Sequence, residues 1–408
     1  MSQTERVAVI GLGMLGRGIA GVAARAGFDV TTYDHDPVVS RRAVEHLRSL
    51  GQDVCTASSI DEVATGADYV IEAVIEDLAI KQRVFAHAGA AAPAATLMSN
   101  SSCLPIGEIA VAAPAPERAI GTHWFNPPEL IPPVEVIAGP RTDAATVARA
   151  TAFTKRLGKV PVFVAKDLPG FVGNRLQHAL CREALAQVSD ENADARAIDT
   201  IVSEHIGQRL AICGPLAEID QLGAAAALAE LSEMLPLINR DPLPARLLRD
   251  KVARGEFGAK TGSGFVVWQP GDRERAASEL AAYLTRRVTE PLSPRPLGEF
   301  GAGLTRDSLR RARRLRASLW REAIALVAGG ICDAETVDLM ACRTFGIRLP
   351  YMGPVATADF VGLDLTLAVH ERIFPTFDPS PAPSPLLIAK ADRGRVAGRF
   401  IRPSAMTR

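Results

Sequence analysis

The chain has little of what marks several large classes of protein. Its six cysteines are dispersed over 408 residues and form neither a CxxC pair nor a metal-ligand spacing, which argues against a disulfide scaffold and a cysteine-based metal site. No apolar run reaches about 18 residues, so we expect no membrane-spanning helix. The first residues lack the apolar stretch of a signal peptide. These absences favour a globular protein of the reducing cytoplasm.

An excess of charge of one sign is missing as well. Lys and Arg number 46, and so do Asp and Glu, which gives a formal net charge of zero. A nucleic-acid-binding surface needs an excess of basic residues, and a disordered chain has low apolar content, whereas 48% of this chain is hydrophobic. We therefore expect no nucleic-acid partner, and the length predicts two or three domains.

A glycine-rich turn between a strand and a helix is the clearest motif that is present. The β-branched run 6–10 leads into Gly11-Leu12-Gly13-Met14-Leu15-Gly16, and an Ala-rich helical pattern follows. In a dinucleotide-binding turn the first glycine permits the tight bend. The second lets a pyrophosphate approach the backbone, and the third lets helix and strand pack closely. Free N–H groups at the helix start hold the phosphates. We therefore predict a cofactor site formed by Gly11, Gly13, Met14, Leu15 and Gly16.

The predicted second strand, 28–33, ends at Asp34, at about the 20-residue distance that this motif requires. A carboxylate there accepts hydrogen bonds from ribose hydroxyls and repels a 2′-phosphate, which favours NAD over NADP. Arg41 and Arg42 are the counter-argument, because a nearby arginine would serve a 2′-phosphate. We interpret them as the exposed face of the next helix.

Strands and helices alternate up to about residue 166, and the further predicted strands are 68–74, 95–99, 118–122, 134–137 and 160–164. This alternation predicts an α/β domain over 1–166 with a Rossmann-type, doubly wound parallel sheet. Beyond residue 170 the pattern becomes helical throughout. The fold prediction is thus a parallel sheet domain followed by two tandem all-α domains.

The helical part repeats itself. Residues 182–255 align without a gap with residues 321–394, at a constant offset of 139. We therefore predict a first helical substrate domain over 167–268, a linker over 269–305 with a short helix at 273–287, and a duplicated helical domain over 306–402. Arg313 of the second copy stands where the first has Asn174. Six arginines between 306 and 316 predict a solvated helix face, with an anion site as the alternative.

Polar residues follow the strands where such a sheet binds its ligand. Asn100-Ser101-Ser102 follows one strand, His123 follows the next, and Glu135 and Asn174 come later. Oxidising an alcohol with NAD needs a base, and an imidazole suits this because its ordinary pKa is about 6.5. A carboxylate on the other ring nitrogen would fix the tautomer. The residues alone predict His123 as the base. They leave two interpretations open for Ser102 and Asn174. Both residues contact the substrate, or Ser102 is a turn former and Asn174 is a helix cap.

Several motifs together resemble the 3-hydroxyacyl-CoA dehydrogenase family. They are the glycine turn and the segments 72–78, 99–102, 123–127, 133–136, 169–175 and 260–265, all in the family's order. The resemblance implies an NAD-dependent dehydrogenase in which His123 is the base and Glu135 its partner. It also implies that Ser102 and Asn174 bind the substrate's oxygens, and that the cofactor and reaction centre are lined by Glu76, Lys81, Asn100 and Asn126.

The departures from the family concern the substrate. Segment 37–68 is shorter than the helical hairpin that helps hold CoA in acyl-CoA members. Segments 101–105, 126–132 and 170–177 resemble the λ-crystallin/L-gulonate dehydrogenase branch. The family resemblance still implies a 3-hydroxyacyl-CoA substrate. The departures make a free small hydroxy acid or alcohol the alternative, and a catalytically silent crystallin-like protein is a third possibility. Family members with one helical domain dimerise through it, so we expect the second copy to pack on the first as an internal pseudo-dimer, with a homodimer as the alternative.

Overall fold

The computed structural model describes residues 4–190, 193–205, 214–222 and 305–345, together with single residues in the stretches 231–282 and 354–373. The chain divides into two compact units, Met1–Phe171 and Val172–Arg408. The predicted linker 269–305, its short helix and the segment 260–265 lie outside the described residues, apart from single positions.

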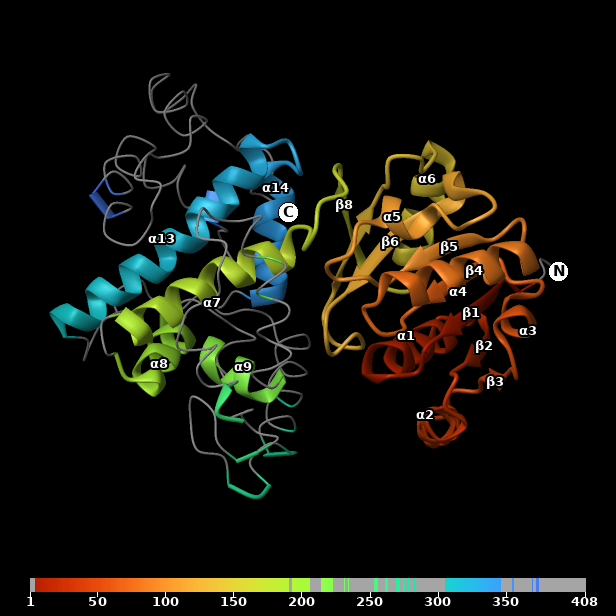
Figure 1. Cartoon of the computed structure of the whole chain (residues 1–408), viewed down its shortest axis with the longest axis horizontal. Coiled ribbons are helices and arrows are strands. Elements are labelled where there is room, and N and C mark those ends of the chain that lie inside the picture. Colours follow the sequence, from red (N-terminus) through yellow and green to blue (C-terminus); the bar gives the residue numbers. More distant parts are fainter. Residues whose placement is uncertain are drawn as a thin grey trace. The chain divides into compact units, whose positions relative to one another are not determined.

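One eight-stranded sheet with the order β3-β2-β1-β4-β5-β6-β7-β8 forms the first unit (Figure 1). Its strands are β1 (Arg6–Ile10), β2 (Asp29–Tyr33), β3 (Cys55–Thr56), β4 (Tyr69–Glu72), β5 (Thr96–Ser99), β6 (Ala119–Trp124), β7 (Pro133–Ile137) and β8 (Val160–Val164). Every neighbouring pair is parallel except β6 and β7. The doubly wound α/β fold is confirmed.

Two details of the predicted sheet were wrong. Strand β7 runs antiparallel to β6, because the loop 125–132 is too short for the crossover of about a dozen residues that a parallel pair needs. Strand β3 was not predicted, since its two residues are exposed and carry no apolar pattern.

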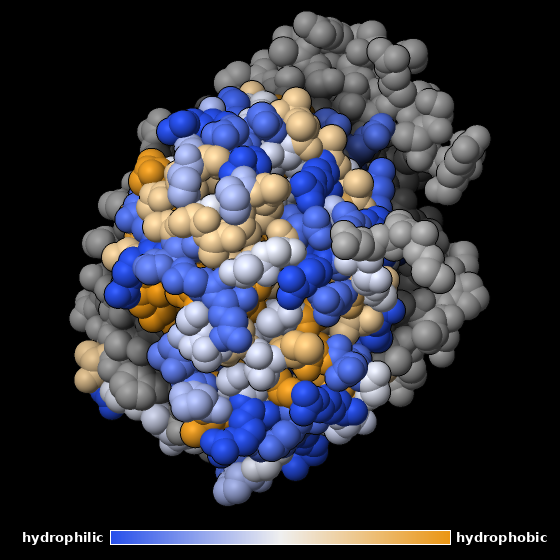
Figure 2. Space-filling view, turned by 90° about the vertical axis from the view of Figure 1, so that its right-hand side faces the viewer, coloured by the Kyte–Doolittle hydropathy of each residue, from blue (hydrophilic) through white to orange (hydrophobic). Residues whose placement is uncertain are grey.

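Helices flank this sheet, and side-chain caps begin several of them. The helices are α1 (Met14–Arg25), α2 (Pro37–Ser49), α3 (Ile60–Ala64), α4 (Leu78–Ala91), α5 (Ile106–Ala110), η1 (Pro116–Arg118) and α6 (Ala144–Arg156). Asp36, Ser59, Asp77 and Asp143 accept hydrogen bonds from backbone N–H groups at the starts of α2, α3, α4 and α6. Apolar side chains of α1, α2 and α6 pack against strands of the sheet in one buried cluster, and buried side chains of α4 and α5 also belong to the core. On the face that Figure 2 presents, hydrophilic residues dominate and apolar ones form small groups.

The described part of the second unit is helical, as predicted. It comprises α7 (Gly173–Asp190), α8 (Ala195–His205), α9 (Pro215–Leu222), α13 (Arg306–Ala328), α14 (Ala334–Met340) and the single turn η4 (Ala341–Phe345). Helices α7 and α13 lie side by side (Figure 1). Within the described part of the chain, no helix is both long and apolar enough to span a bilayer.

The basic run that opens α13 is only in part a solvated face. Arg306, Arg310 and Arg313 are exposed, whereas Arg314 is buried. The prediction was wrong at Arg314, because the helical period turns this position towards α7, where Glu183 forms an ion pair with it.

Candidate active site

The glycine turn between β1 and α1 has the shape that a dinucleotide needs. Gly11 has a φ of +92°, and a Cβ there would lie 2.6 Å from the carbonyl oxygen of Ala73. A Cβ on Gly16 would lie 1.8 Å from the carbonyl oxygen of Gly11. Gly13 differs, because a Cβ there meets no protein atom within 4 Å. Gly11 and Gly16 are therefore required by the protein's own packing, and Gly13 leaves open the space that a pyrophosphate would need.

Helix α1 begins without a side-chain cap. Its N-cap residue is Gly13, and no side chain accepts a hydrogen bond from the first turn. The N–H groups of a helix start that lacks such a cap bind anions well. Met14 is exposed beside this turn, and Leu15 is half-buried against the core. The start of α1 therefore fits the phosphates of a dinucleotide.

Asp34 lies beside the same turn at the end of β2. Its Oδ2 accepts a hydrogen bond from the N–H of Leu12 at 2.7 Å, and its Oδ1 accepts one from Asp36 at 2.9 Å. These bonds hold the carboxylate against the glycine turn, where ribose hydroxyls would meet it. Arg41 and Arg42 are exposed on α2, in agreement with their interpretation as a surface face.

His123 and Glu135 are directly opposite residues of the antiparallel pair β6 and β7. Their Nδ1 and Oε2 atoms are 2.6 Å apart, and the residues are 4% and 0% exposed. Because a carboxylate only accepts, Nδ1 carries the donated proton and Nε2 is the basic nitrogen of the neutral ring. The rings of Phe125 and Phe171 lie 4.6 Å and 5.8 Å from the imidazole. The arrangement is an imidazole with a fixed tautomer in apolar surroundings.

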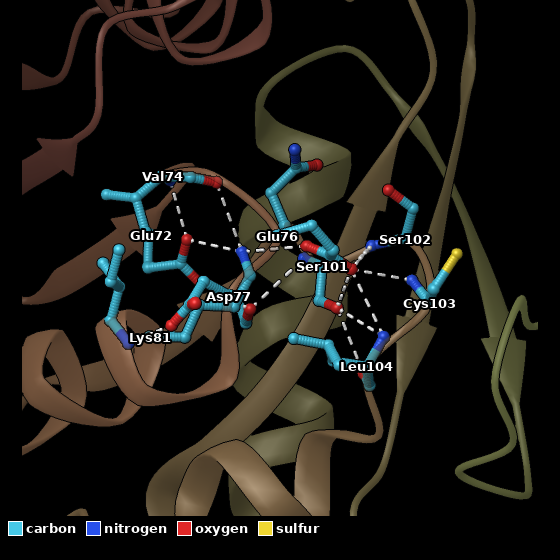
Figure 3. A network of polar contacts seen from close by, with 12 residues as sticks. Glu72, Val74, Glu76, Asp77, Lys81, Ser101, Ser102, Cys103 and Leu104 are labelled. Atoms are coloured by element: carbon cyan, nitrogen blue, oxygen red, sulfur yellow. Dashed lines mark hydrogen bonds and ion pairs between the residues drawn. The ribbon is translucent and has the colours of Figure 1, made fainter. Parts of the chain in front are cut away.

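A buried network of charges connects β4 with α4 (Figure 3). The Nζ of Lys81, which is 1% exposed, lies 2.8 Å from Oε1 of Glu72 and 3.2 Å from Oε2 of Glu76. Ser99 and the N–H of Val74 also donate to the carboxylate of Glu72. Burial raises the pKa of Glu72, although Lys81 opposes this. Burial acts in the same sense on Glu76, but Lys81 and several hydrogen-bond donors outweigh it and lower the pKa of that carboxyl.

Glu76 fixes the backbone of the loop that carries Ser102. Its Oε1 accepts hydrogen bonds from the hydroxyl of Ser101 at 2.6 Å and from the N–H groups of Ser102, Cys103 and Leu104 at 2.9, 2.8 and 3.2 Å (Figure 3). Charge-assisted bonds of this kind are roughly twice as strong as neutral ones. Ser102 is therefore presented by a rigid loop, as a group that orients a substrate needs to be.

The loops after β5 and β6 are tied together at the site. The side-chain oxygen of Asn100 accepts a hydrogen bond at 2.9 Å from the N–H of Trp124, the residue after His123. Asn126 is half-buried in the following loop, where its peptide bond to Pro127 is cis. The buried ammonium group of Lys159 donates to two carbonyl oxygens of the same loop, those of Pro128 and Ile131.

The structure thus brings most of the expected site residues into three groups within the first unit. Asp34 lies at the glycine turn, Glu135 at His123, and Lys81 with Glu76 behind the loop of Ser102. Asn174 is buried at the start of α7 in the second unit. The parts that these residues play in binding and catalysis stay predictions.

Two further residues of this region had no role in the sequence-based expectation. Glu72 is the one carboxylate in the apolar strand 69–72, and a charge within a buried strand is a signal that a partner exists. Lys159 precedes β8 with nothing in its neighbourhood to distinguish it from a surface lysine. Its hydrogen-bond partners are backbone carbonyl oxygens of the loop 126–131, and a sequence pattern does not show such contacts.

Replacing Lys81 with Met is expected to destabilise the protein by about 3–5 kcal/mol, because Glu72 is left buried without its counter-charge. Since the pKa of Glu72 would rise further, the loss should be larger at about pH 8 than at about pH 5. Urea unfolding of the full-length chain measures both effects. The exposed Lys155 offers a control, and Lys155→Met should change stability by less than about 0.5 kcal/mol. Equal stability of the two variants would contradict this account of the network.

Comparison with models of protein families gives two matches. The model described as 3-hydroxyacyl-CoA dehydrogenase, NAD binding domain, matches residues 6–168. The model of the C-terminal domain of 3-hydroxyacyl-CoA dehydrogenase matches two stretches, residues 170–268 and 312–399.

Individual relatives point the same way. The chain is 36% identical over 306 residues to 5-formyl-3-hydroxy-2-methylpyridine 4-carboxylate 5-dehydrogenase of Mesorhizobium japonicum, covering 70% of this chain and 98% of the relative. It is 34% identical to a probable 3-hydroxybutyryl-CoA dehydrogenase of Bacillus subtilis, covering 65% of this chain and 98% of the relative. The crystal structure of 3-hydroxybutyryl-CoA dehydrogenase from Escherichia coli shares the fold, with a TM-score of 0.76, 23% identity and coverage of 96% of this chain and 99% of that one.

Proposed function

The chain belongs to the 3-hydroxyacyl-CoA dehydrogenase family, and we propose that it interconverts a 3-hydroxyacyl-CoA and its 3-ketoacyl-CoA through a His123–Glu135 dyad. Membership makes it an NAD-dependent oxidoreductase that acts on a CH–OH group. The observation that carries the proposal is the pair itself. A buried imidazole lies 2.6 Å from a buried carboxylate across β6 and β7.

The residues of the first unit fit the cofactor. The open side of Gly13 and the uncapped start of α1 would hold the pyrophosphate, and Asp34 would hold the ribose hydroxyls. When bound, NAD supplies the hydride acceptor. Asn100 and Asn126 lie on the loops that follow β5 and β6, at the carboxyl ends of these strands, and would line the nicotinamide end of the cofactor.

His123 and Glu135 carry out the transfer of the substrate's hydroxyl proton. Nε2 of His123 takes the hydroxyl proton as the neighbouring carbon loses its hydride, and Glu135 stabilises the imidazolium that forms. In the reductive direction the imidazolium returns this proton to the carbonyl oxygen. Phe125 and Phe171 keep the ring in apolar surroundings, which strengthens its attraction to Glu135. Ser102 and Asn174 would hydrogen-bond the substrate's oxygens.

A free hydroxy acid is the second candidate, and one structural observation favours it. Between β2 and β4 the chain forms only α2, the two-residue strand β3 and the five-residue helix α3. This region is compact compared with the long hairpin expected of a CoA-holding member. The name of the Mesorhizobium relative also gives a small carboxylate, a formyl-substituted pyridine, as the compound on which that protein acts.

The substrate is tested by two parallel assays on the full-length protein. One follows NADH oxidation with acetoacetyl-CoA, and the other follows NAD reduction with a panel of free hydroxy acids that includes 3-hydroxybutyrate and L-gulonate. We expect kcat/KM for the thioester to exceed that for every free acid by at least about 10²-fold, because a CoA-specific site uses the remote handle to lower the barrier. The reverse ranking would establish the second candidate. No turnover with any substrate would indicate a silent, crystallin-like protein.

We also propose that residues 306–402 are a second helical domain duplicated from residues 167–268 and joined to it by the linker 269–305. Two matched features support this. Helices α8 and α14 begin at Ala195 and Ala334, the offset found in the sequence. Asp199 accepts a hydrogen bond from the N–H of Leu216, and Asp338 accepts one from Val355, its counterpart at the same offset. The arrangement would be an internal pseudo-dimer.

A further inference from the structure

Two ion pairs connect α7 and α13 crosswise. Nε of Arg175 on α7 lies 2.8 Å from Oε1 of Glu322 on α13. Nε of Arg314 on α13 lies 2.8 Å from Oε1 of Glu183 on α7. All four side chains are buried. Because the earlier residue of each helix pairs with the later residue of the other, the two helices run antiparallel.

These four residues are two sets of equivalents. Arg175 corresponds to Arg314 and Glu183 to Glu322 at the offset of 139. Reciprocal contacts, in which each residue of one copy meets the partner's counterpart in the other, are what a twofold interface between identical surfaces produces. The contact between α7 and α13 therefore has the form of a dimer interface within one chain.

The symmetry is broken beside one of the two pairs. Asn174 precedes Arg175 and is buried, whereas Arg313 precedes Arg314 and is exposed. Two ion pairs with the same length and similar burial thus lie next to residues of different kinds. Only the pair of Arg175 and Glu322 adjoins a residue that the proposed function assigns to the substrate.

We propose that Glu322, contributed by the second helical repeat, is a positioning residue for the reaction. It holds Arg175 and thereby fixes the first turn of α7, which sets the orientation of the Asn174 amide. This inference rests on the proposed function, which gives Asn174 its contact with the substrate's oxygen. The first turn of a helix frays easily because its N–H groups lack helical partners. Glu322, in contrast, lies well inside α13, which spans Arg306–Ala328.

Fixed geometry, rather than stability, is what such a pair provides. Burial raises the pKa of Glu322 to about 7, against the opposing effect of Arg175 and Arg321. Burial also raises the pKa of Glu183, against Arg314. Buried ion pairs of this kind are weak sources of net stability. A displacement of about 1 Å in a substrate-orienting group is nevertheless enough to lower a rate by about 10²-fold.

The pseudosymmetry supplies a matched control for the test. Glu322→Gln and Glu183→Gln each remove one buried carboxylate from an equivalent pair in the full-length chain. We expect Glu322→Gln to lower kcat by about 10- to 10²-fold, with little change in the affinity for NAD. Glu183→Gln should change kcat by less than about 2-fold. Glu183 also accepts a hydrogen bond from Gln187. Glu183→Gln should therefore lower the free energy of unfolding at least as much as Glu322→Gln does. Equal effects of the two variants on kcat would overturn the proposal.

A double-mutant cycle separates positioning from a general structural effect. If Glu322 acts through Asn174, Glu322→Gln should cause no further loss of kcat in the Asn174→Ala background, and Glu322→Asp should restore part of the rate. Additive losses would overturn the positioning role and leave the role of Asn174 intact. An Asn174→Ala variant with parental kcat would instead overturn the proposed function at this residue, and the inference with it. Should the glutamine variants not fold, Arg175→Lys and Arg314→Lys give the same comparison.

Discussion

Replacing His123 with Ala is expected to lower kcat by about 10²–10⁴-fold, because proton transfer to a positioned base contributes a factor of this size. The imidazole is buried and bonded through Nδ1 to Glu135, so no water molecule or neighbouring side chain takes over its geometry without rearrangement. Steady-state kinetics with the substrate that the parallel assays identify measure the loss. The affinity for NAD should change little, since we propose that the glycine turn, and not His123, holds the phosphates and the ribose.

Glu135→Gln and His87→Ala complete this experiment. The glutamine keeps the shape of Glu135 and removes the charge that we propose stabilises the imidazolium, so we expect a loss in kcat of the same kind but of smaller size. His87 lies on the surface beside Asp61, and its replacement should leave kcat unchanged. Parental activity in His123→Ala would assign the base to another residue and remove the basis of the proposed mechanism.

Most of the first unit could be predicted because its signals are local. The β-branched runs became strands, and a turn with glycines at three fixed positions has few interpretations between a strand and a helix. The antiparallel entry of β7 was missed because β-branched composition does not encode strand direction, although the short loop 125–132 restricts it. Strand β3 was missed because two exposed residues leave no apolar pattern.

The predictability of the site decreases with the number of separate segments that contribute to a contact. His123 and Glu135 carry recognisable motifs, and their pairing needs only the register of two neighbouring strands. The burial of Lys81 between two glutamates depends on the packing of α4 against β4. The ion pair of Arg314 with Glu183 depends on two repeats far apart in the sequence. Nothing in a run of arginines shows which of them turn inward, so a solvated face was expected for all six.

Replacing Gly13 with Val is expected to lower the affinity for NAD by at least about 10²-fold, which corresponds to about 2.7 kcal/mol, while the protein folds normally. No protein atom lies within 4 Å of the position that a Cβ would take at Gly13, so the side chain would extend into the space meant for the pyrophosphate. Gly13 is also the N-cap of α1, and the change from Gly at this position should cost no more than about 1 kcal/mol of stability. Titration with NADH, followed by fluorescence, measures the affinity, and urea unfolding measures the stability.

Gly16→Ala is the control for Gly13→Val, because we expect it to affect the stability of the fold. Its Cβ would lie 1.8 Å from the carbonyl oxygen of Gly11, a distance that no side-chain adjustment relieves, because the atom it meets belongs to the backbone. This smaller substitution should therefore destabilise the first unit severely, whereas the larger one at Gly13 should not. A Gly13→Val protein that binds NADH like the parent would show that the pyrophosphate does not cross this glycine. It would then remove the reason for placing the nicotinamide near His123.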